Sequence, residues 1–335
     1  MRNCVYVLGG RQRQRVLKRE EEWTLYDRAV ILEVDLDSES VSTRVEYDTP
    51  EDIRPGKESS VLFKAGTLVG EKLYTCTSTE VLTYEVPHFK LAGYVSIACF
   101  NDLHHVCPTP AGTLLVVNTG LDAVVEVTPE GKVVRQWSVL GEDTWARFSK
   151  DIDYRKVLTT KPHRSHPNFV FLLDDEVWVT RGEQRDAICL TRPGERINIG
   201  IEFPHDGLVQ GEKIYFTTVN GRLVVVNRNN FEIEDVVDFP AMDDSGSLLG
   251  WCRGIHAGEG GRMCVGFTRV RKTKFMQNIN WVKHAGKDRE KPTHIAVYDI
   301  AAKKFLKEID LEKHGLNVIF NMVPARVSSD GPRSV

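Results

Sequence analysis

The sequence predicts an all-β fold, a six-bladed β-propeller with four antiparallel strands in each blade. Two observations lead to this fold class. Short β-rich runs closed by glycine, asparagine, aspartate or proline fill most of the chain, and helical periodicity is almost absent. Six segments repeat one plan and begin near residues 3, 60, 101, 163, 203 and 250. Where no insertion intervenes, the spacing is about forty residues, the length of one blade.

The blade plan can be followed along the chain. Segment three reads HHVCPTPAGTLLVVNTGLDAVVEVTPEGKVVRQWSV, with turns at PAG and TPEGK between its strands. Segment four reads HPNFVFLLDDEVWVTRGEQRDAICL, and segment six resumes after an insertion with HIAVYDIAAKKFLKEIDL. The last strand-like run, Asn317 to Val323, is expected to return to the first blade and close the ring, which leaves no open edge there.

We therefore expect a single domain over residues 1–335, with insertions near 141–162 and 268–293. Loops of this length in a compact fold are functional or disordered. The second insertion carries several cationic residues beside Phe275 and Trp281. It reads either as a solvated hairpin tip or as a lid for an anionic ligand.

Composition excludes some classes of function. The net charge of −3 and the pI near 6.4 give no basic field for nucleic acid. No apolar stretch approaches the length of a membrane span. The seven cysteines are odd in number and form no CxxC pair, so we expect reduced thiols in a cytoplasmic protein. The oligomeric state is left open.

A comparison of two blades identifies the residues that are free to vary. Residues 63–77 read FKAGTLVGEKLYTCT and residues 204–218 read PHDGLVQGEKIYFTT. The glycines and the GEK turn coincide, but Lys64 and Ala65 stand where His205 and Asp206 stand. The shared frame belongs to the blade, whereas the differing residues are expected to point into the central channel, where function rather than folding selects them.

The chain resembles the six-bladed propellers that include gluconolactonases, strictosidine synthases, NHL-repeat proteins and virginiamycin-type lyases. The resemblance rests on an HxN motif at His166 and Asn168, on PHDGLV at 204–209, and on the run GTLLVVNTGLDAVVEV. It implies the blade plan over nearly the whole chain and no single activity. The gluconolactonase calcium site is not implied, because no EGP-type glutamate motif is present.

When the blade segments are aligned, a histidine falls at the equivalent position of the inner strand in four successive blades. The predicted metal ligands are His105, His166, His205 and His256. His104 is the alternative to His105, because the two face opposite ways on a strand, and His105 is preferred for its alignment with His205. Four imidazoles suit a divalent transition metal, Fe, Mn, Zn, Ni or Cu.

The leading functional hypothesis is a metal-dependent lyase, isomerase or oxidoreductase that acts on a small anionic substrate at the channel mouth. Asp206 is the candidate for moving protons and Arg253 for holding the anionic group. Two alternatives stay open: a metal-free transferase or hydrolase that uses a channel histidine, by analogy with arylsulfotransferase-like propellers, and a non-catalytic scaffold that binds a ligand or protein.

Overall fold

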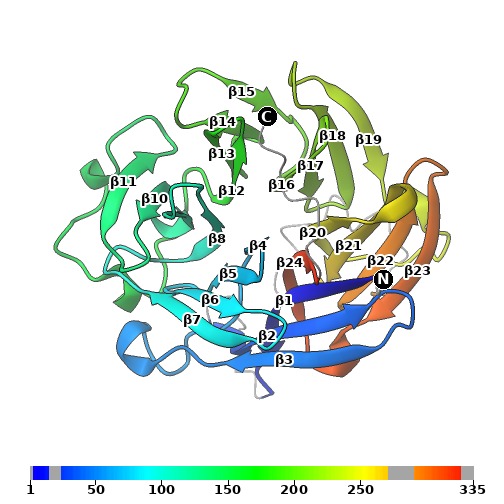
Figure 1. Cartoon of the computed structure of the whole chain (residues 1–335), viewed down its shortest axis with the longest axis horizontal. Helices are drawn as coiled ribbons and strands as arrows, with labels where there is room; N and C mark the ends of the chain where they lie inside the picture. The colour runs from blue at the N-terminus through cyan, green and yellow to red at the C-terminus, as the bar shows by residue number, and fades with distance from the viewer. Residues whose placement is uncertain (1–2, 15–23, 271–289, 326–335) are drawn as a thin grey trace.

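The computed structural model describes residues 3–14, 24–270 and 290–325 of the chain. Six four-stranded antiparallel sheets stand around a common centre as the blades of a propeller (Figure 1). The predicted all-β architecture, the number of blades and the number of strands in each are confirmed. The segment starts read from the sequence also agree with the blade boundaries.

Blade 1 contains β1 (Cys4–Gln12), β2 (Tyr26–Asp35), β3 (Val41–Tyr47) and β24 (Val318–Pro324). Blade 2 contains β4 (Thr67–Val69), β5 (Lys72–Cys76), β6 (Val81–Glu85) and β7 (Lys90–Val95). Blade 3 contains β8 (Leu103–Pro108), β9 (Leu114–Asn118), β10 (Ala123–Val127) and β11 (Val133–Ser138).

Blade 4 contains β12 (Pro167–Leu173), β13 (Glu176–Arg181), β14 (Asp186–Cys189) and β15 (Arg196–Asn198). Blade 5 contains β16 (Pro204–Gln210), β17 (Lys213–Thr218), β18 (Arg222–Asn227) and β19 (Ile233–Asp238). Blade 6 contains β20 (Trp251–Ala257), β21 (Arg262–Thr268), β22 (His294–Asp299) and β23 (Lys304–Asp310).

The ring is closed by β24, as the sequence predicts. This strand is the innermost of blade 1 and pairs antiparallel with β1, from Val5 opposite Pro324 to Gly10 opposite Val318. The two backbones approach so closely that a Cβ atom on Gly9 would lie 1.7 Å from the Val318 carbonyl oxygen. The closure therefore requires glycine at this position.

The core lies between neighbouring blades. One buried apolar cluster joins Cys76 and Val81 of blade 2 to Val106 and Val116 of blade 3. Since each blade covers its apolar faces only with its neighbours, most of the hydrophobic stabilisation comes from these contacts, at about 25 cal/mol per Å² of apolar area.

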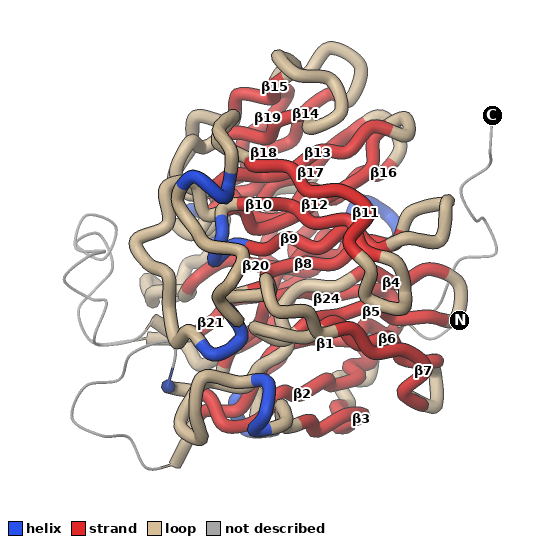
Figure 2. Tube along the Cα trace, turned by 90° about the vertical axis from the view of Figure 1, so that its left-hand side faces the viewer, coloured by secondary structure: helices blue, strands red, loops and turns tan. Residues whose placement is uncertain are grey.

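Helices are restricted to short 3-10 turns among the described residues. They are η2 (Glu51–Ile53), η3 (Thr119–Leu121), η4 (Thr144–Ala146), η5 (Tyr154–Lys156), η6 (Pro240–Met242), η7 (Glu259–Gly261) and η9 (Glu312–His314). Figure 2 shows many of them, with the longer loops, on one side of the ring. Over the described ranges, no helix has the length and apolar character needed to cross a membrane.

The two predicted insertions differ in how far they can be followed. Residues 141–162 contain η4 and η5 and pack on blade 3, where Tyr154 joins Leu121 and Ala123 in a buried cluster. Of the second insertion, residues 271–289 lie outside the described residues, and with them most of the predicted cationic lid. Arg269 at its start is half-exposed and pairs with Glu312, its Nε 3.1 Å from the Oε2 atom.

Candidate functional site

A bulge in the inner strands aims selected side chains at the centre of the ring. The pairing of β8 with β9 shifts at His104, that of β12 with β13 at Asn168, and that of β24 with β1 at Phe320. In β20 the same irregularity includes Arg253. Because a bulge leaves an extra residue unpaired, it reverses the alternation of side chains beyond it.

Phe320 marks the meeting point of these strands. The Nζ atom of Lys64 from blade 2 lies 4.4 Å from its ring centroid, and the guanidinium carbon of Arg253 from blade 6 lies 4.7 Å from it. The His104 ring of blade 3 approaches the same phenyl ring edge-on at 6.0 Å. Four blades thus contribute to one centre, and the two cations are stabilised by the π face of the ring.

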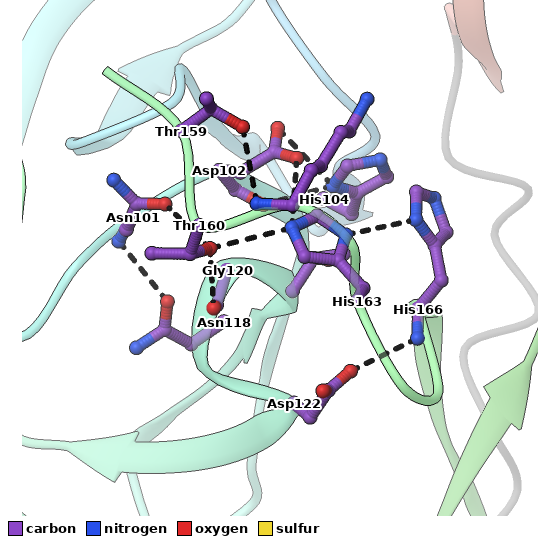
Figure 3. A network of polar contacts seen from close by, with 12 residues as sticks. Asn101, Asp102, His104, Asn118, Gly120, Asp122, Thr159, Thr160, His163 and His166 are labelled. Atoms are coloured by element: carbon purple, nitrogen blue, oxygen red, sulfur yellow. Dashed lines mark hydrogen bonds and ion pairs between the residues drawn. The ribbon is translucent and has the colours of Figure 1, made fainter. Parts of the chain in front are cut away.

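A pair of histidines from the end of the first insertion and the start of blade 4 lies beside this centre (Figure 3). The Nδ1 atoms of His163 and His166 are 3.1 Å apart. The His166 ring also meets that of His104 edge-on, with 4.9 Å between centroids. Imidazoles separated by about sixty residues in the chain therefore form one cluster, and the cluster includes a direct imidazole–imidazole hydrogen bond.

Asp122 fixes the loop that carries this pair. Its Oδ1 atom accepts hydrogen bonds from the backbone N–H groups of Ser165 and His166, and its Oδ2 atom accepts one from Arg164, each at 3.0 Å. Arg147 of the insertion donates to Oδ2 at 2.9 Å. Since Asp122 is buried, these four charge-assisted hydrogen bonds hold the His166 backbone firmly, in a left-handed conformation with φ of 55°.

The surrounding hydrogen bonds determine which nitrogens carry protons. Thr160 donates its single hydroxyl proton to the Gly120 carbonyl at 2.6 Å, so its oxygen accepts from Nε2–H of His163 at 3.4 Å. The Nδ1 atom of neutral His163 is then an acceptor, and His166 donates to it through Nδ1–H. The Nε2 atom of His166 is left with a lone pair.

Burial keeps these imidazoles neutral near neutral pH. It lowers the pKa of His166 well below the usual value, and His104 and His163 add to the effect. Burial also lowers the pKa of His163, although the negative charge of Asp102 opposes it. For His104, burial and the nearby Lys64 lower the pKa. A neutral imidazole with a lone pair on Nε2 can accept a proton.

Asp102 connects the imidazoles to the cations. Its Oδ1 atom lies 3.2 Å from Nζ of Lys64, and its Oδ2 atom lies 4.0 Å from Nε2 of His163. Burial alone would raise the pKa of Asp102, but Lys64, then His104 and Lys161, lower it overall. The carboxylate is therefore ionised and stabilises any positive charge that develops on the histidine pair.

A pocket of about 60 Å³ opens beside Asp102, between the segment that links blades 1 and 2 and the end of the first insertion. A volume of this size accommodates a few water molecules or the end of a small ligand. Three of its lining residues are cationic, Arg54, Lys64 and Lys161, and one, Asp102, is acidic. The other polar lining residues supply mainly hydroxyl groups, from serines and threonines.

The preference for His105 over His104 is wrong. The His105 ring stacks on Phe169 with 3.7 Å between centroids, and its Nδ1 atom accepts from the Val170 N–H at 3.3 Å. Its Nε2 atom contacts Thr67 Oγ1 at 3.2 Å, and that hydroxyl donates to the Val106 carbonyl. Both ring nitrogens thus serve the packing of neighbouring blades, and His104, in the bulge, takes the central position.

The other predicted residues are distributed as follows. The Phe203 ring lies between His205 and His166, with centroids 5.7 Å and 5.2 Å away respectively. His256 pairs with Cys264 in blade 6, and within the described chain no ring contact joins it to the other channel histidines. Arg253 is buried at the centre, between the Trp251 and Phe320 rings.

Asp206 links three blades instead of joining the imidazoles. Its carboxylate accepts from Thr217 Oγ1 at 2.5 Å and from the Gly254 N–H at 3.1 Å, and its carbonyl accepts from Thr180 Oγ1 at 2.6 Å. Burial raises the pKa of this carboxyl to about 6, and the hydrogen bonds from Thr217 and Gly254 hold the pKa down in part. It therefore fastens blades 4, 5 and 6 to one another.

These positions do not form the predicted four-histidine metal centre. His105 has no lone pair to offer, and His163 and His166 direct their Nδ1 atoms at each other. Over residues 3–14, 24–270 and 290–325, no three or more His, Cys, Asp or Glu side chains are arranged to hold a metal ion. The donor set therefore does not fit the predicted centre, while metal binding as such stays a prediction.

Neither His163 nor Asp102 was predicted as a site residue from the sequence. His163 lies just after the first insertion and before the first strand of blade 4, so the blade alignment gave it no position on a strand. The available signal was the spacing His-Arg-Ser-His at 163–166, which brings two histidines together at a strand start. Asp102 precedes β8 in a left-handed conformation, with φ of 46°, which the repeat alone does not reveal.

Comparison with known proteins supports the fold and no more. No protein-family model matches the chain, and no curated protein matches it. A protein of unknown function from Bacteroides caccae has a TM-score of 0.61 at 14% identity, over 97% of this chain and 100% of its own. A chain of a nidogen–laminin complex has a TM-score of 0.56 at 7% identity, over 95% and 97%. At these identities the likeness shows a shared six-bladed propeller.

Proposed function

We propose that this protein is a metal-free acid–base enzyme that acts on a small anionic molecule. The anionic end of the substrate binds in the pocket between Lys64 and Lys161, and the reacting end extends toward Nε2 of His166. The hydrogen bond between His163 and His166 carries the proposal, because it orients the His166 ring and occupies Nδ1, while burial keeps the ring neutral and able to accept a proton on Nε2.

The surrounding residues favour the transfer of a proton from the substrate, or from a water molecule, to His166. When its Nε2 atom takes a proton from the substrate or from a water molecule, positive charge develops on the pair. His166 can pass its Nδ1 proton to His163, which lies nearer to the Asp102 carboxylate. The Asp102 charge stabilises the resulting imidazolium, and Lys64 and Lys161 stabilise negative charge that develops on the substrate.

The proposal is tested by proton NMR in deuterated buffer. The protein is incubated with a panel of small carboxylic acids and their esters, and loss of the α-proton signal or ester cleavage is followed. We expect a reaction that survives chelator treatment and is lost in His166→Gln. His256→Gln is the matched control, since it removes a half-buried histidine outside the cluster, and it should retain the rate.

Two results would contradict the proposal. One is a reaction that stops on chelation and returns with a divalent metal, together with about one equivalent of metal in protein prepared without a histidine tag. The other is binding of panel members with neither exchange nor hydrolysis. That outcome would favour a non-catalytic ligand-binding protein, the second candidate, which the cation-lined pocket supports without the histidine pair.

A further inference from the structure

His104 presents a second unprotonated ring nitrogen beside His166. Its Nδ1–H group donates to the Asp102 carbonyl at 2.9 Å, and burial keeps the ring neutral, so the lone pair lies on Nε2. The His104 side chain is only 6% exposed, yet none of the residues that the structure describes hydrogen-bonds to this Nε2 atom. A buried acceptor of this kind is costly unless a ligand or a water molecule supplies the donor.

The pocket and the two imidazoles border on the same centre. The rings of His104 and His166 meet edge-on with 4.9 Å between their centroids (Figure 3). Lys64 lines the pocket and its Nζ atom lies 4.4 Å from the centroid of the Phe320 ring, which the His104 ring approaches at 6.0 Å. A ligand that extends from the pocket toward Nε2 of His166 therefore meets the His104 ring as well.

The contact between these two rings limits how a substrate can use them. A substrate held between two rings needs about 7 Å, twice a van der Waals contact of about 3.5 Å, whereas the centroids are 4.9 Å apart. Both imidazoles therefore act on one face of the substrate. When His166 takes a proton from carbon, His104 can accept only from a donor on the same carbon or next to it.

We propose that His104 accepts a hydrogen bond from a hydroxyl group of the substrate, and that the substrates are small 2-hydroxycarboxylates. The inference rests on the proposed function, whose substrate class it specifies. The hydroxyl donates to Nε2 of His104 while the hydrogen on the same carbon faces Nε2 of His166. An ammonium group could donate too, but burial is the main cause of the low pKa of His104, and it would strip an ammonium of its water in the same way.

The test compares glycolate, acetate and glycine by NMR titration of the full chain. Glycolate and acetate differ by one hydroxyl group, and glycine carries an ammonium group in its place. The wild-type protein is expected to bind glycolate about tenfold more tightly than acetate, because acetate leaves Nε2 of His104 without a donor. Glycine should bind no more tightly than acetate.

Two variants separate ligand recognition from support of the fold. His104→Asn keeps an N–H group near the position of Nδ1 for the Asp102 carbonyl but places nothing at Nε2, so the preference for glycolate should vanish while acetate affinity stays. His104→Gln places an amide oxygen near the position of Nε2 and should keep most of the preference. His256→Asn is the matched control, since it changes a histidine of blade 6 outside the cluster, and it should keep the wild-type ratio.

Equal affinities for glycolate and acetate in the wild type, or an unchanged ratio in His104→Asn, would overturn the inference. Tighter binding of glycine than of glycolate would do so as well, and equal weakening of all three ligands in His104→Asn would show that His104 only supports the fold. These outcomes are separate from the fate of the proposed function. A preference for glycolate without His166-dependent chemistry would refute the enzyme, whereas chemistry without that preference would refute only the role of His104.

Discussion

The Nδ1 atoms of His163 and His166 face each other at 3.1 Å, so one proton serves both rings. Two imidazolium ions in this arrangement would point N–H groups at each other, and the pair therefore titrates as a unit. The arrangement resembles a relay that ends on Nε2 of His166. Its orientation depends on Thr160, in the first insertion, and on Asp122, which immediately precedes β10 of blade 3.

We expect His105→Ala to affect stability and not the site. The substitution removes the stacked ring and leaves the buried Val170 N–H without its acceptor. The free energy of unfolding should fall by about 2–4 kcal/mol. The His166-dependent reaction should keep its wild-type rate. Denaturant unfolding and the NMR assay of that reaction measure the two effects, and a change in rate without loss of stability would contradict the structural role of His105.

Gly9→Ala tests the closure of the ring. The added Cβ would collide with the Val318 carbonyl oxygen and push β24 away from β1. We expect a loss of about 3 kcal/mol or more, or aggregation through the opened edge. Gly56→Ala is the control, because its Cβ would meet no atom within 4 Å. If the two variants unfold at the same denaturant concentration, β24 does not close the ring as described.

Asp206 makes the stability of the fold depend on pH, with a loss of stability as pH rises. Its pKa rises from 3.8 to about 6 on folding, so between these values the native state binds more protons than the unfolded state. This group's contribution to stability is therefore greatest at low pH and falls as pH rises through about 6, by about 3 kcal/mol in all.

Asp206→Asn removes this contribution while keeping an oxygen acceptor for Thr217 and Gly254. Urea unfolding of both proteins from mildly acidic to neutral pH measures the effect. The stability of the wild type relative to the variant should decline over that range. A constant difference between the two curves would show that the carboxyl titrates normally.

The fold could be predicted because each repeat carries turn sequences and alternating apolar runs that are recognisable locally. Turns such as PAG and TPEGK recur at blade spacing, and the alternating runs between them can bury their apolar faces only against another blade. The closing strand could be predicted for the same reason. Asn317 to Val323 has strand character but follows the sixth repeat, so it has no further strands of its own to pair with.

The site could be predicted only in part. His166, His205 and Arg253 could be placed near the centre, because the repeat indicates where each lies relative to the inner strand of its blade. His105 was chosen wrongly because the bulge at His104 changes which side chain faces inward, and a one-residue shift of this kind leaves no mark in the sequence. His163 and Asp102 depend on tertiary contacts of an insertion with blade 3, which the blade alignment could not supply.

The central claim is that His166 presents an unprotonated Nε2, and nitrogen-15 NMR of the imidazole rings tests it most directly. We expect that, near neutral pH, both His163 and His166 are neutral, with the proton on Nε2 in His163 and on Nδ1 in His166. A proton on Nε2 of His166, or a positively charged pair at that pH, would contradict it.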